Sequence, residues 1–301
     1  MGKRVAVTGS SGLIGGALCR HLTDRGDTVL RLVRRDAQGP DELRWDPARG
    51  ELDSAALEGV DAVVNLAGVG IGDKRWNAEH KRDVERSRTD ATGTVAHALV
   101  RVAEQSGRRI RLVNASAVGF YGDRGDELLT EQSGPGQDFL SGVVTRWEEA
   151  TQPAIDAGLS VAWARTGLVM SPHAGAFSPL LRLGRLGLGG PMGTGREWWP
   201  WITIVDEVAA LTHLVDHDEM VGPVNLVAPT PARQKDIARE LGRALHRPAF
   251  VPAPRFALRT VIGEFADSII ASQRLEPQVL TRAGFGFEHA DLTSAVSWLV
   301  R

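Results

Sequence analysis

The stretch RVAVTGSSGLIGGALCRHL, residues 4–22, decides the fold. Its apolar start favours a buried strand, and Gly9, Gly12 and Gly15 follow at once and open a predicted helix over 12–26. In such a turn the first glycine permits the tight bend, the second lets backbone amides approach a pyrophosphate, and the third lets the helix pack closely on the strand. The helix N-terminus also presents unpaired N–H groups and a partial positive charge to an anion. The stretch therefore predicts a dinucleotide site formed by Gly9, Ser10, Ser11, Gly12, Leu13, Ile14 and Gly15; a glycine-rich turn without a ligand is the alternative.

Beyond this turn, β-rich runs alternate with helical stretches. The predicted strands are 28–34, 61–67, 109–116 and 159–166, and the predicted helices are 77–105 and 138–157. Strands that alternate with helices form a parallel sheet covered on both faces. The fold class predicted from this order is α/β, with a Rossmann-like doubly wound parallel sheet.

The pattern changes after about residue 170. Residues 171–200 are rich in glycine and proline and predict no regular element, whereas 206–217 predict a helix and 222–229 a short strand. The sequence after residue 229 has a mainly helical pattern that is interrupted by prolines. We therefore expect an NADP-binding domain over 1–170, to which residues 200–230 return, and a smaller, mostly helical substrate lobe over 171–301 with a helical C-terminal module at about 248–298.

Composition and charge exclude several classes of protein. The 301-residue chain carries 35 Lys and Arg against 37 Asp and Glu, a net charge of −2 that argues against a nucleic-acid partner, whose phosphates need a basic surface. Cys19 is the single cysteine, so no intrachain disulfide and no cysteine-based zinc site can form. Of the histidines only His213 and His217 have a metal-ligand spacing, and they lack a third ligand. With no apolar run of roughly 18 residues and no signal-peptide pattern, we expect a cytoplasmic protein with neither a metal nor a membrane partner.

The end of the second predicted strand indicates which dinucleotide is bound. A carboxylate there would bind the ribose 2′-hydroxyl of NAD, whereas arginine accommodates the 2′-phosphate of NADP. The strand reads LRLVRR, with Val33 at the place of the acid and Arg34 and Arg35 next. A planar guanidinium matches a phosphate well, so the sequence predicts NADP(H). The alternative is that both arginines belong to a solvated strand end.

Several motifs, in order, resemble a known family. TGSSGLIG (8–15), NLAG (65–68) and ASAVGFYG (115–122) resemble the extended branch of the short-chain dehydrogenase/reductases. A narrower resemblance, to the "epimerase family protein" subgroup with its small helical C-terminal module, rests on DKRW (73–76), SRTDATGT (87–94), RWEE (146–149), RTGLVMS (165–171), RLGLGGPMGTG (185–195), AGFGF (283–287) and residues 251–280. The resemblance covers nearly the whole chain and implies a Rossmann-like, NADP-binding fold of unassigned substrate.

The resemblance also implies positions around the cofactor. Leu66, Ala67 and Gly68 would lie beside the adenosine half, and Asp46 would meet the adenine amino group, unless WDP is simply a turn. Near the nicotinamide the implied residues are Ala115, Arg165, Gly167 and Leu168. The glycine-rich loop 185–195 and Trp198, Trp199 and Trp201 would belong to the substrate side, although three tryptophans are equally good core residues.

The family's usual acid/base pair is absent from this sequence. A tyrosine and a lysine four residues later, which lowers the pKa of the phenol, are expected early in the helix that contains RWEE. Either plausible register gives Phe139 with Val143 or Leu140 with Val144, and the only tyrosine is Tyr121. The remaining catalytic candidates are Ser116, at the position of the family's active-site serine or threonine, Tyr121 and Asp90. Each of the three has a purely structural role as its alternative. Ser116 would cap the end of a strand, Tyr121 would be a half-buried aromatic residue, and Asp90 would be a carboxylate on the helix surface.

A polar cluster is expected near the same edge of the sheet. Arg75, Trp76 and Lys81, with Arg88, are suited to an anionic or planar substrate. The alternative is a solvated, salt-bridged helix face, above all for Lys81.

These residues predict an NADP(H)-dependent oxidoreductase that acts on a small carbonyl or alcohol. Ser116 would polarise the substrate oxygen, and Tyr121, Asp90 or a water would supply the proton. One alternative is a non-catalytic NADP(H)-binding sensor or scaffold, and another is an enzyme of the sugar-nucleotide epimerase/dehydratase kind. The expected partner is a small-molecule substrate; a homodimer built on the helices at 77–105 and 138–157 and a monomer are both left open.

Overall fold

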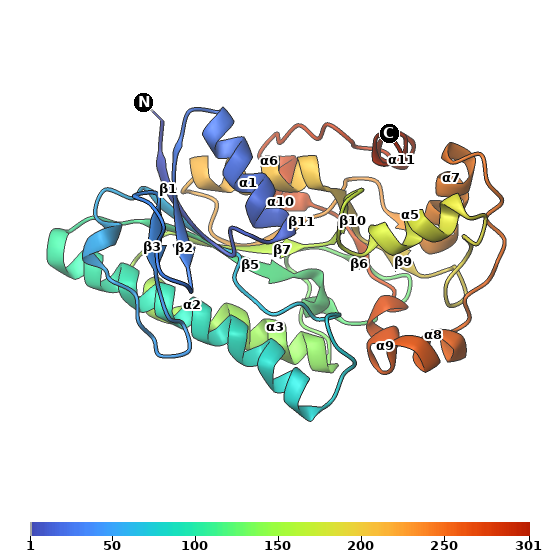
Figure 1. Ribbon diagram of the computed structural model, residues 1–301, viewed down its shortest axis with the longest axis horizontal. Helices are drawn as coiled ribbons and strands as arrows, with labels where there is room; N and C mark the ends of the chain where they lie inside the picture. Colours follow the sequence, from blue (N-terminus) through green and yellow to red (C-terminus); the bar gives the residue numbers. More distant parts are fainter. Residues whose placement is uncertain (1) are drawn as a thin grey trace.

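A seven-stranded parallel sheet forms the centre of the computed structural model, which describes residues 2–301 (Figure 1). From one edge to the other its strands are β3 (Glu42–Arg44), β2 (Thr28–Val33), β1 (Arg4–Thr8), β4 (Ala62–Asn65), β5 (Arg111–Ala117), β7 (Val161–Thr166) and β11 (Gly222–Leu226). The order reverses between β1 and β4, and ligands of such sheets bind in the crevice at this point, outside the carboxyl ends of the strands. This arrangement confirms the predicted Rossmann-like fold class.

Helices cover both faces of the sheet (Figure 1). One face carries α1 (Leu13–Asp24), α6 (Ile204–Asp216) and α10 (Gln278–Arg282), and the other carries α2 (Ala78–Ser106), α3 (Phe139–Glu149) and α4 (Gln152–Asp156). The side chains of β1 alternate between the two layers, as the period of a strand requires. Val5 and Val7 pack with Leu18 of α1, whereas Ala6 packs with Leu99 of α2.

The remaining elements form a second lobe beyond the carboxyl ends of the strands (Figure 1). They are β8 (Leu168–Met170), which pairs with β10 (Trp201–Thr203), β9 (Trp198–Trp199), which pairs with β12 (Ala232–Arg233), β6 (Leu128–Leu129), which pairs with β13 (Arg274–Leu275), and the helices α5 (Phe177–Arg185), α7 (Gln234–Ala244), α8 (Arg255–Ile262), α9 (Phe265–Ile269) and α11 (Leu292–Leu299). Short 3₁₀ turns lie at Ala55–Leu57 and Val118–Tyr121. A separate apolar core joins Phe177, Leu241 and Leu299 in this lobe.

Two predictions of secondary structure were wrong, and one strand was not predicted. Residues 171–200 contain α5, whose Phe177 and Leu181 are buried, and its Gly184 lies so close to Leu245 that a Cβ would be 2.8 Å from the leucine Cδ1. The helix predicted over 138–157 is divided into α3 and α4, and Pro153, which cannot donate a helical N–H bond, lies at the start of α4. The edge strand β3 is only three residues long and was missed.

Polar side chains fix both ends of α6. At its start, Thr203 caps the helix by accepting the N–H of Asp206. The Asp206 carboxylate accepts the backbone N–H groups of Glu288 (2.7 Å) and His289 (3.1 Å), which ties the C-terminal segment to this helix.

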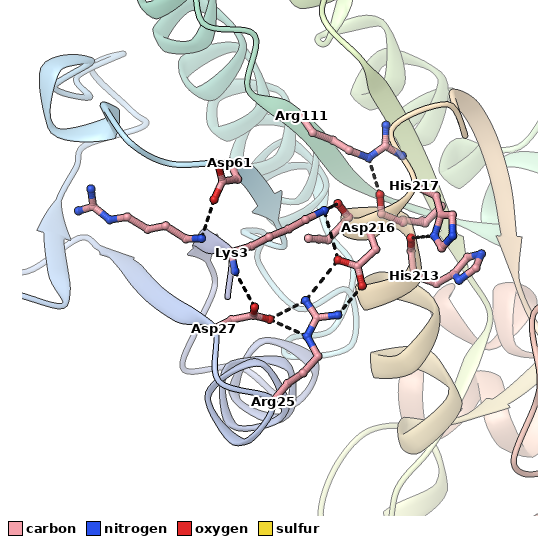
Figure 2. A network of polar contacts seen from close by, with 11 residues as sticks. Lys3, Arg25, Asp27, Asp61, Arg111, His213, Asp216 and His217 are labelled. Atoms are coloured by element: carbon pink, nitrogen blue, oxygen red, sulfur yellow. Dashed lines mark hydrogen bonds and ion pairs between the residues drawn. The ribbon is translucent and has the colours of Figure 1, made fainter. Parts of the chain in front are cut away.

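The C-terminal end of α6 is surrounded by cations (Figure 2). Its last carbonyls have no partner within the helix, and a positive charge there also complements the helix dipole. The guanidinium of Arg111 donates to the carbonyls of Leu214, Asp218 and Met220, and Lys3 donates to Val215. Burial lowers the pKa of Arg111 to about 10, so the group keeps its charge at neutral pH.

We predict that Arg111→Met lowers the free energy of unfolding by about 2–4 kcal/mol, because several buried carbonyls lose their donors at once. Lys3→Met is the control: its side chain is 36% exposed, so a loss of less than about 1 kcal/mol is expected. Urea unfolding followed by circular dichroism measures both values. Equal losses in the two variants would contradict this account of Arg111.

Candidate functional site

A cavity of about 1260 Å³ lies along the crevice between β1 and β4. We call it the crevice cavity. The predicted cofactor residues that line it are Gly9, Ser10, Ser11, Gly12, Arg34, Arg35, Asp46, Leu66, Ala67 and Gly68, and the catalytic candidate Asp90 lines it too. Lining residues that were not predicted include Cys19, Arg20, Arg31, Trp45, Val69, Asp73, Lys74, His80, Asp83, Arg86 and Ser87. Most of these residues lie on α1, β2 or α2. Only the tertiary arrangement brings them to the cavity, so local sequence patterns do not identify them.

The glycine turn fits an anion. Gly9 has φ +62°, and a Cβ on it would lie 2.7 Å from the carbonyl oxygen of Leu66. A Cβ on Gly15 would lie 2.2 Å from the carbonyl oxygen of Gly9. Within residues 2–301, the amides of Leu13 and Ile14 in the first turn of α1 have no hydrogen-bond acceptor. Two unpaired amides at a helix N-terminus beside the cavity are what a pyrophosphate needs.

A buried polar network fixes the loop after β4. The Thr8 hydroxyl accepts the N–H groups of Leu66 (2.9 Å) and Ala67 (3.0 Å) and donates to the Asn65 amide oxygen (2.7 Å). The Asn65 amide nitrogen donates to Asn114 at the same level of β5 (2.7 Å). Leu66 to Gly68 are therefore held in place on one wall of the cavity.

The two predicted phosphate-binding arginines differ in their surroundings. Arg35 makes a bidentate ion pair with Glu42 (2.7 and 2.6 Å), which lowers the pKa of that carboxyl to about 2. Arg34 is exposed on the cavity wall and pairs with no side chain or carbonyl in residues 2–301. Its guanidinium is therefore available to a ligand phosphate. Asp46 lies on the cavity wall and also begins a turn, where its carboxylate accepts the N–H of Ala48 (3.1 Å).

Ser116 and Arg165 lie in a buried cluster and not on the wall of the crevice cavity. The Ser116 hydroxyl donates to the Glu148 carboxylate of α3 (2.6 Å), and Arg165 forms a bidentate pair with the same carboxylate (2.8 Å each). Both side chains therefore face α3, each less than 5% exposed. The placement of Ser116 at the substrate and of Arg165 at the nicotinamide is corrected accordingly.

Tyr121 belongs to the same cluster. Its hydroxyl donates to the amide oxygen of Asn225 (2.7 Å) and accepts a hydrogen bond from Arg165 (3.0 Å). The side chain is fully buried, and this burial raises the pKa of the phenol. The expectation that Tyr121 faces the nicotinamide pocket is therefore also corrected. Of the three catalytic candidates only Asp90, which is exposed on α2, lines the cavity.

Ala115, Gly167 and Leu168 lie at or near the carboxyl ends of the strands but do not line the cavity. Ala115 pairs with Ala164 within the sheet. Gly167 contacts the segment before β10, where a Cβ on it would be 2.3 Å from the carbonyl oxygen of Pro200. Leu168 begins β8 and pairs with Trp201.

The DKRW segment lies against the C-terminal module. Trp76 contacts Phe139 and Phe265, with ring centroids 5.2 and 5.5 Å apart. Lys81 forms an ion pair with Glu264 (2.5 Å), and Arg75 donates weakly to the carbonyl of Arg259 (3.4 Å). These contacts link the start of α2 to α8 and α9, a role that the sequence did not predict.

The three tryptophans that were predicted to lie on the substrate side have different environments. Trp199 and Trp201 are core residues, only 3% and 1% exposed, so their assignment to the substrate is corrected. Trp198 is half-buried; its indole N–H donates to Asp126 (2.6 Å), and the guanidinium of Arg233 lies 4.3 Å from its ring centroid. Asp126 and Arg233 line a second cavity of about 800 Å³, which lies within the second lobe beside α8.

Glu207 is a buried acid that sequence reasoning missed. It lies in the first turn of α6, where its carboxyl accepts the hydroxyl of Thr166 (2.7 Å) and its other oxygen has no partner in residues 2–301. Complete burial raises its pKa to about 8, so the group is protonated at neutral pH.

We predict that Glu207→Gln stabilises the protein increasingly as the pH rises. The pKa of Glu207 is about 8 in the folded state and about 4.3 in the unfolded state, so the native protein must hold a proton that the unfolded chain releases. The variant's gain in free energy of unfolding is absent below pH 4. It grows by about 1.4 kcal/mol per pH unit between the two pKa values and levels off above pH 8. Thermal unfolding at several pH values measures it, with the exposed Glu104→Gln as control. An advantage that does not change with pH would contradict the assignment.

The geometry defines the class of this protein as a Rossmann-type α/β protein with a dinucleotide-shaped crevice. The model of the NAD dependent epimerase/dehydratase family matches residues 5–227, and that of a domain of unknown function, DUF1731, matches residues 253–299. The chain therefore belongs to the NAD dependent epimerase/dehydratase family and, within it, to the extended short-chain dehydrogenase/reductases of the epimerase-family-protein kind. The resemblance seen in the sequence is confirmed.

Known relatives match over almost the whole chain. Epimerase family protein ML0860 of Mycobacterium leprae is 40% identical over 295 residues, 98% of this chain and 94% of the relative, and human SDR39U1 is 35% identical over 99% of both chains. The crystal structure of human SDR39U1 with NADPH superposes with a TM-score of 0.89 at 32% identity and covers 99% of both chains. That of the nucleoside-diphosphate sugar epimerase from Corynebacterium glutamicum gives 0.81 at 34% identity, over 100% of this chain and 58% of the other.

Residues 2–301 contain neither a metal-binding cluster nor a membrane-spanning helix. No group of three or more His, Cys, Asp or Glu side chains in that range is arranged to hold a metal ion. None of the helices there combines the length and the apolar character that a membrane crossing requires.

Proposed function

We propose that this chain is an NADP(H)-dependent oxidoreductase of the extended short-chain type that acts on a small carbonyl or alcohol. The observation that carries the proposal is the pairing, in one cavity, of the open helix N-terminus behind Gly9 and Gly12 with the unpaired Arg34. The human relative crystallised with NADPH supports the same cofactor.

The pyrophosphate and the adenosine half of the cofactor would meet residues of suitable chemistry. The amides of Leu13 and Ile14 would hold the pyrophosphate, Arg34 the 2′-phosphate, and Asp46 with Leu66 to Gly68 the adenosine. When bound, the nicotinamide supplies or takes the hydride. Because Ser116 and Tyr121 are engaged within the protein, the proton would come from Asp90 or a water instead.

We predict that Arg34→Met raises the Kd for NADPH about tenfold to hundredfold, since it removes a charge-assisted phosphate contact. The Kd for NADH should stay unchanged because that cofactor lacks the 2′-phosphate. Arg35→Met is the matched comparison and should have the smaller effect, because Glu42 already holds that guanidinium. Calorimetric titration of the cofactor-stripped protein measures all three. Equal Kd values for NADPH and NADH in the wild type would overturn the NADP(H) assignment.

A second candidate, a sensor or scaffold that binds NADP(H) without turnover, is favoured by one observation. The Ser116 and Tyr121 hydroxyls both lie in the cluster around Arg165, and the residues expected from the resemblance at the positions of the family's tyrosine and lysine are apolar. A sugar-nucleotide epimerase or dehydratase needs an efficient base at the same place, and the same observation disfavours it.

Stopped-flow mixing of the NADPH complex with a panel of carbonyl compounds separates the candidates. Substrate-dependent oxidation of NADPH is the outcome expected of the oxidoreductase, and its absence across a broad panel would favour the sensor. In an active protein Tyr121→Phe should change the rate by less than about tenfold, whereas loss of a proton donor slows catalysis by about 10²–10⁴-fold. A loss of about 10²–10⁴-fold in Tyr121→Phe would instead assign Tyr121 as the proton donor.

A further inference from the structure

The charged side chains between α2 and α3 are paired, with one exception. Lys81 of α2 lies 4.9 Å from the ring centroid of Phe139 and is neutralised by Glu264. Glu85, one turn further, makes a bidentate pair with Arg146 of α3 (2.7 and 2.8 Å). Arg88, two turns beyond Lys81 on the same face of α2, forms no ion pair with any carboxylate in residues 2–301.

The guanidinium of Arg88 is anchored by one nitrogen only. Its Nη1 donates to the carbonyls of Val69 (3.0 Å) and Val84 (2.8 Å), and its Cζ lies 5.0 Å from the ring centroid of Trp147. Within residues 2–301, Nε and Nη2 have no hydrogen-bond partner, yet neither is sealed from solvent. Burial lowers the pKa of Arg88 to about 10, so the group stays charged at neutral pH.

The other two deeply buried guanidinium groups are satisfied within the protein. Arg165 has the Glu148 carboxylate on two nitrogens and the Tyr121 hydroxyl on the third. Arg111 uses all three nitrogens on carbonyls and one hydroxyl at the end of α6. Of these three groups, Arg88 is the one that keeps two adjacent nitrogens, the pair that binds a carboxylate or phosphate side-on, without an acceptor.

Arg88 lies directly behind the wall of the crevice cavity and is not itself one of the lining residues. Its side chain packs against Gly68, where a Cβ would be 3.3 Å from the guanidinium carbon, and Gly68 lines the cavity. The neighbouring Ser87 lines the cavity too, and its hydroxyl accepts the N–H of Val69. The loop 68–69 therefore separates the guanidinium from the cavity by little more than a backbone.

We propose that Arg88 is an anion-binding residue, and that the substrate of this protein carries a carboxylate or phosphate group that its Nε and Nη2 receive. Only water can satisfy these two nitrogens in the free protein, and an anionic substrate would offer them charge-assisted hydrogen bonds instead. The proposal rests on the proposed function, because it names the substrate class of the same cleft.

The test uses the protein saturated with NADPH, so that the cofactor's own phosphate sites are filled. Acetate and inorganic phosphate are titrated at constant ionic strength, with chloride as the balancing salt, and thermal stability is followed. We expect saturable stabilisation by at least one of the two anions, and the better of them identifies the carboxylate or the phosphate. Arg88→Met should weaken this binding at least tenfold, and Arg88→Lys, which keeps the charge but loses the side-on pair, by a smaller factor.

Arg82→Met is the matched control, because Arg82 is exposed on the same helix, lines neither cavity and makes no polar contact in residues 2–301. It should leave the anion effect unchanged. The Arg Nε–H resonance that is missing from Arg88→Lys should shift with anion in the wild type, which tests the contact even if Arg88→Met fails to fold.

Three outcomes would overturn the proposal: no saturable anion effect, an effect that persists in Arg88→Met, or a tenfold loss of NADPH affinity in that variant, which would assign Arg88 to a cofactor phosphate. The NADPH titration of the wild type is read separately. If it shows no binding, the proposed function fails, and the same anion titration of the free protein still decides the role of Arg88.

Discussion

The close approach of the glycine turn to the end of β4 is the constraint on which the rest of the structure depends. Gly9 is in the left-handed region against the carbonyl of Leu66, and Gly15 presses the first turn of α1 onto Gly9 itself. A side chain at either position would collide with backbone, which cannot move aside as a flexible side chain does. The hydroxyl of Thr8 then binds both strand ends together. The sheet, the open helix N-terminus and one wall of the crevice are fixed by this single contact between two strand ends.

A buried ion pair links the central sheet to α3. Arg165 and Glu148 join β7 to α3, and Ser116 and Tyr121 are bound to them. Such a pair contributes little net stability, because removing both charges from water offsets most of their attraction. It fixes geometry instead, since breaking either partner would leave an uncompensated charge in the core. The hydroxyls of Ser116 and Tyr121 are therefore occupied by hydrogen bonds within the protein.

The sequence predicted the fold more fully than the site, and the reason is physical. Apolar runs and the glycine turn are local signals, so the strands and the nucleotide end of the cleft could be read directly. Ser116 was misplaced because its orientation depends on strand alternation and on Glu148, which is 32 residues away in the chain. Trp198 and Trp199 are adjacent, yet only tertiary packing decides which of them enters the core. The same holds for α5, whose apolar face is interrupted by glycine.

The C-terminal segment, which matches a family model of its own, is attached to its surroundings at four places. Its α8 and α9 reach Trp76 and Lys81 at the start of α2, while α10 packs on β11 of the central sheet and α11 on α7. Between α10 and α11, Asp206 holds the backbone at Glu288 and His289. In mechanical terms, residues 253–299 are a strap fastened at both ends, so the segment cannot swing away from the cleft as a hinged lid does. Its first helices, α8 and α9, contact the start of α2, so any movement of these helices pulls on the loop before α2, which forms part of the wall of the crevice.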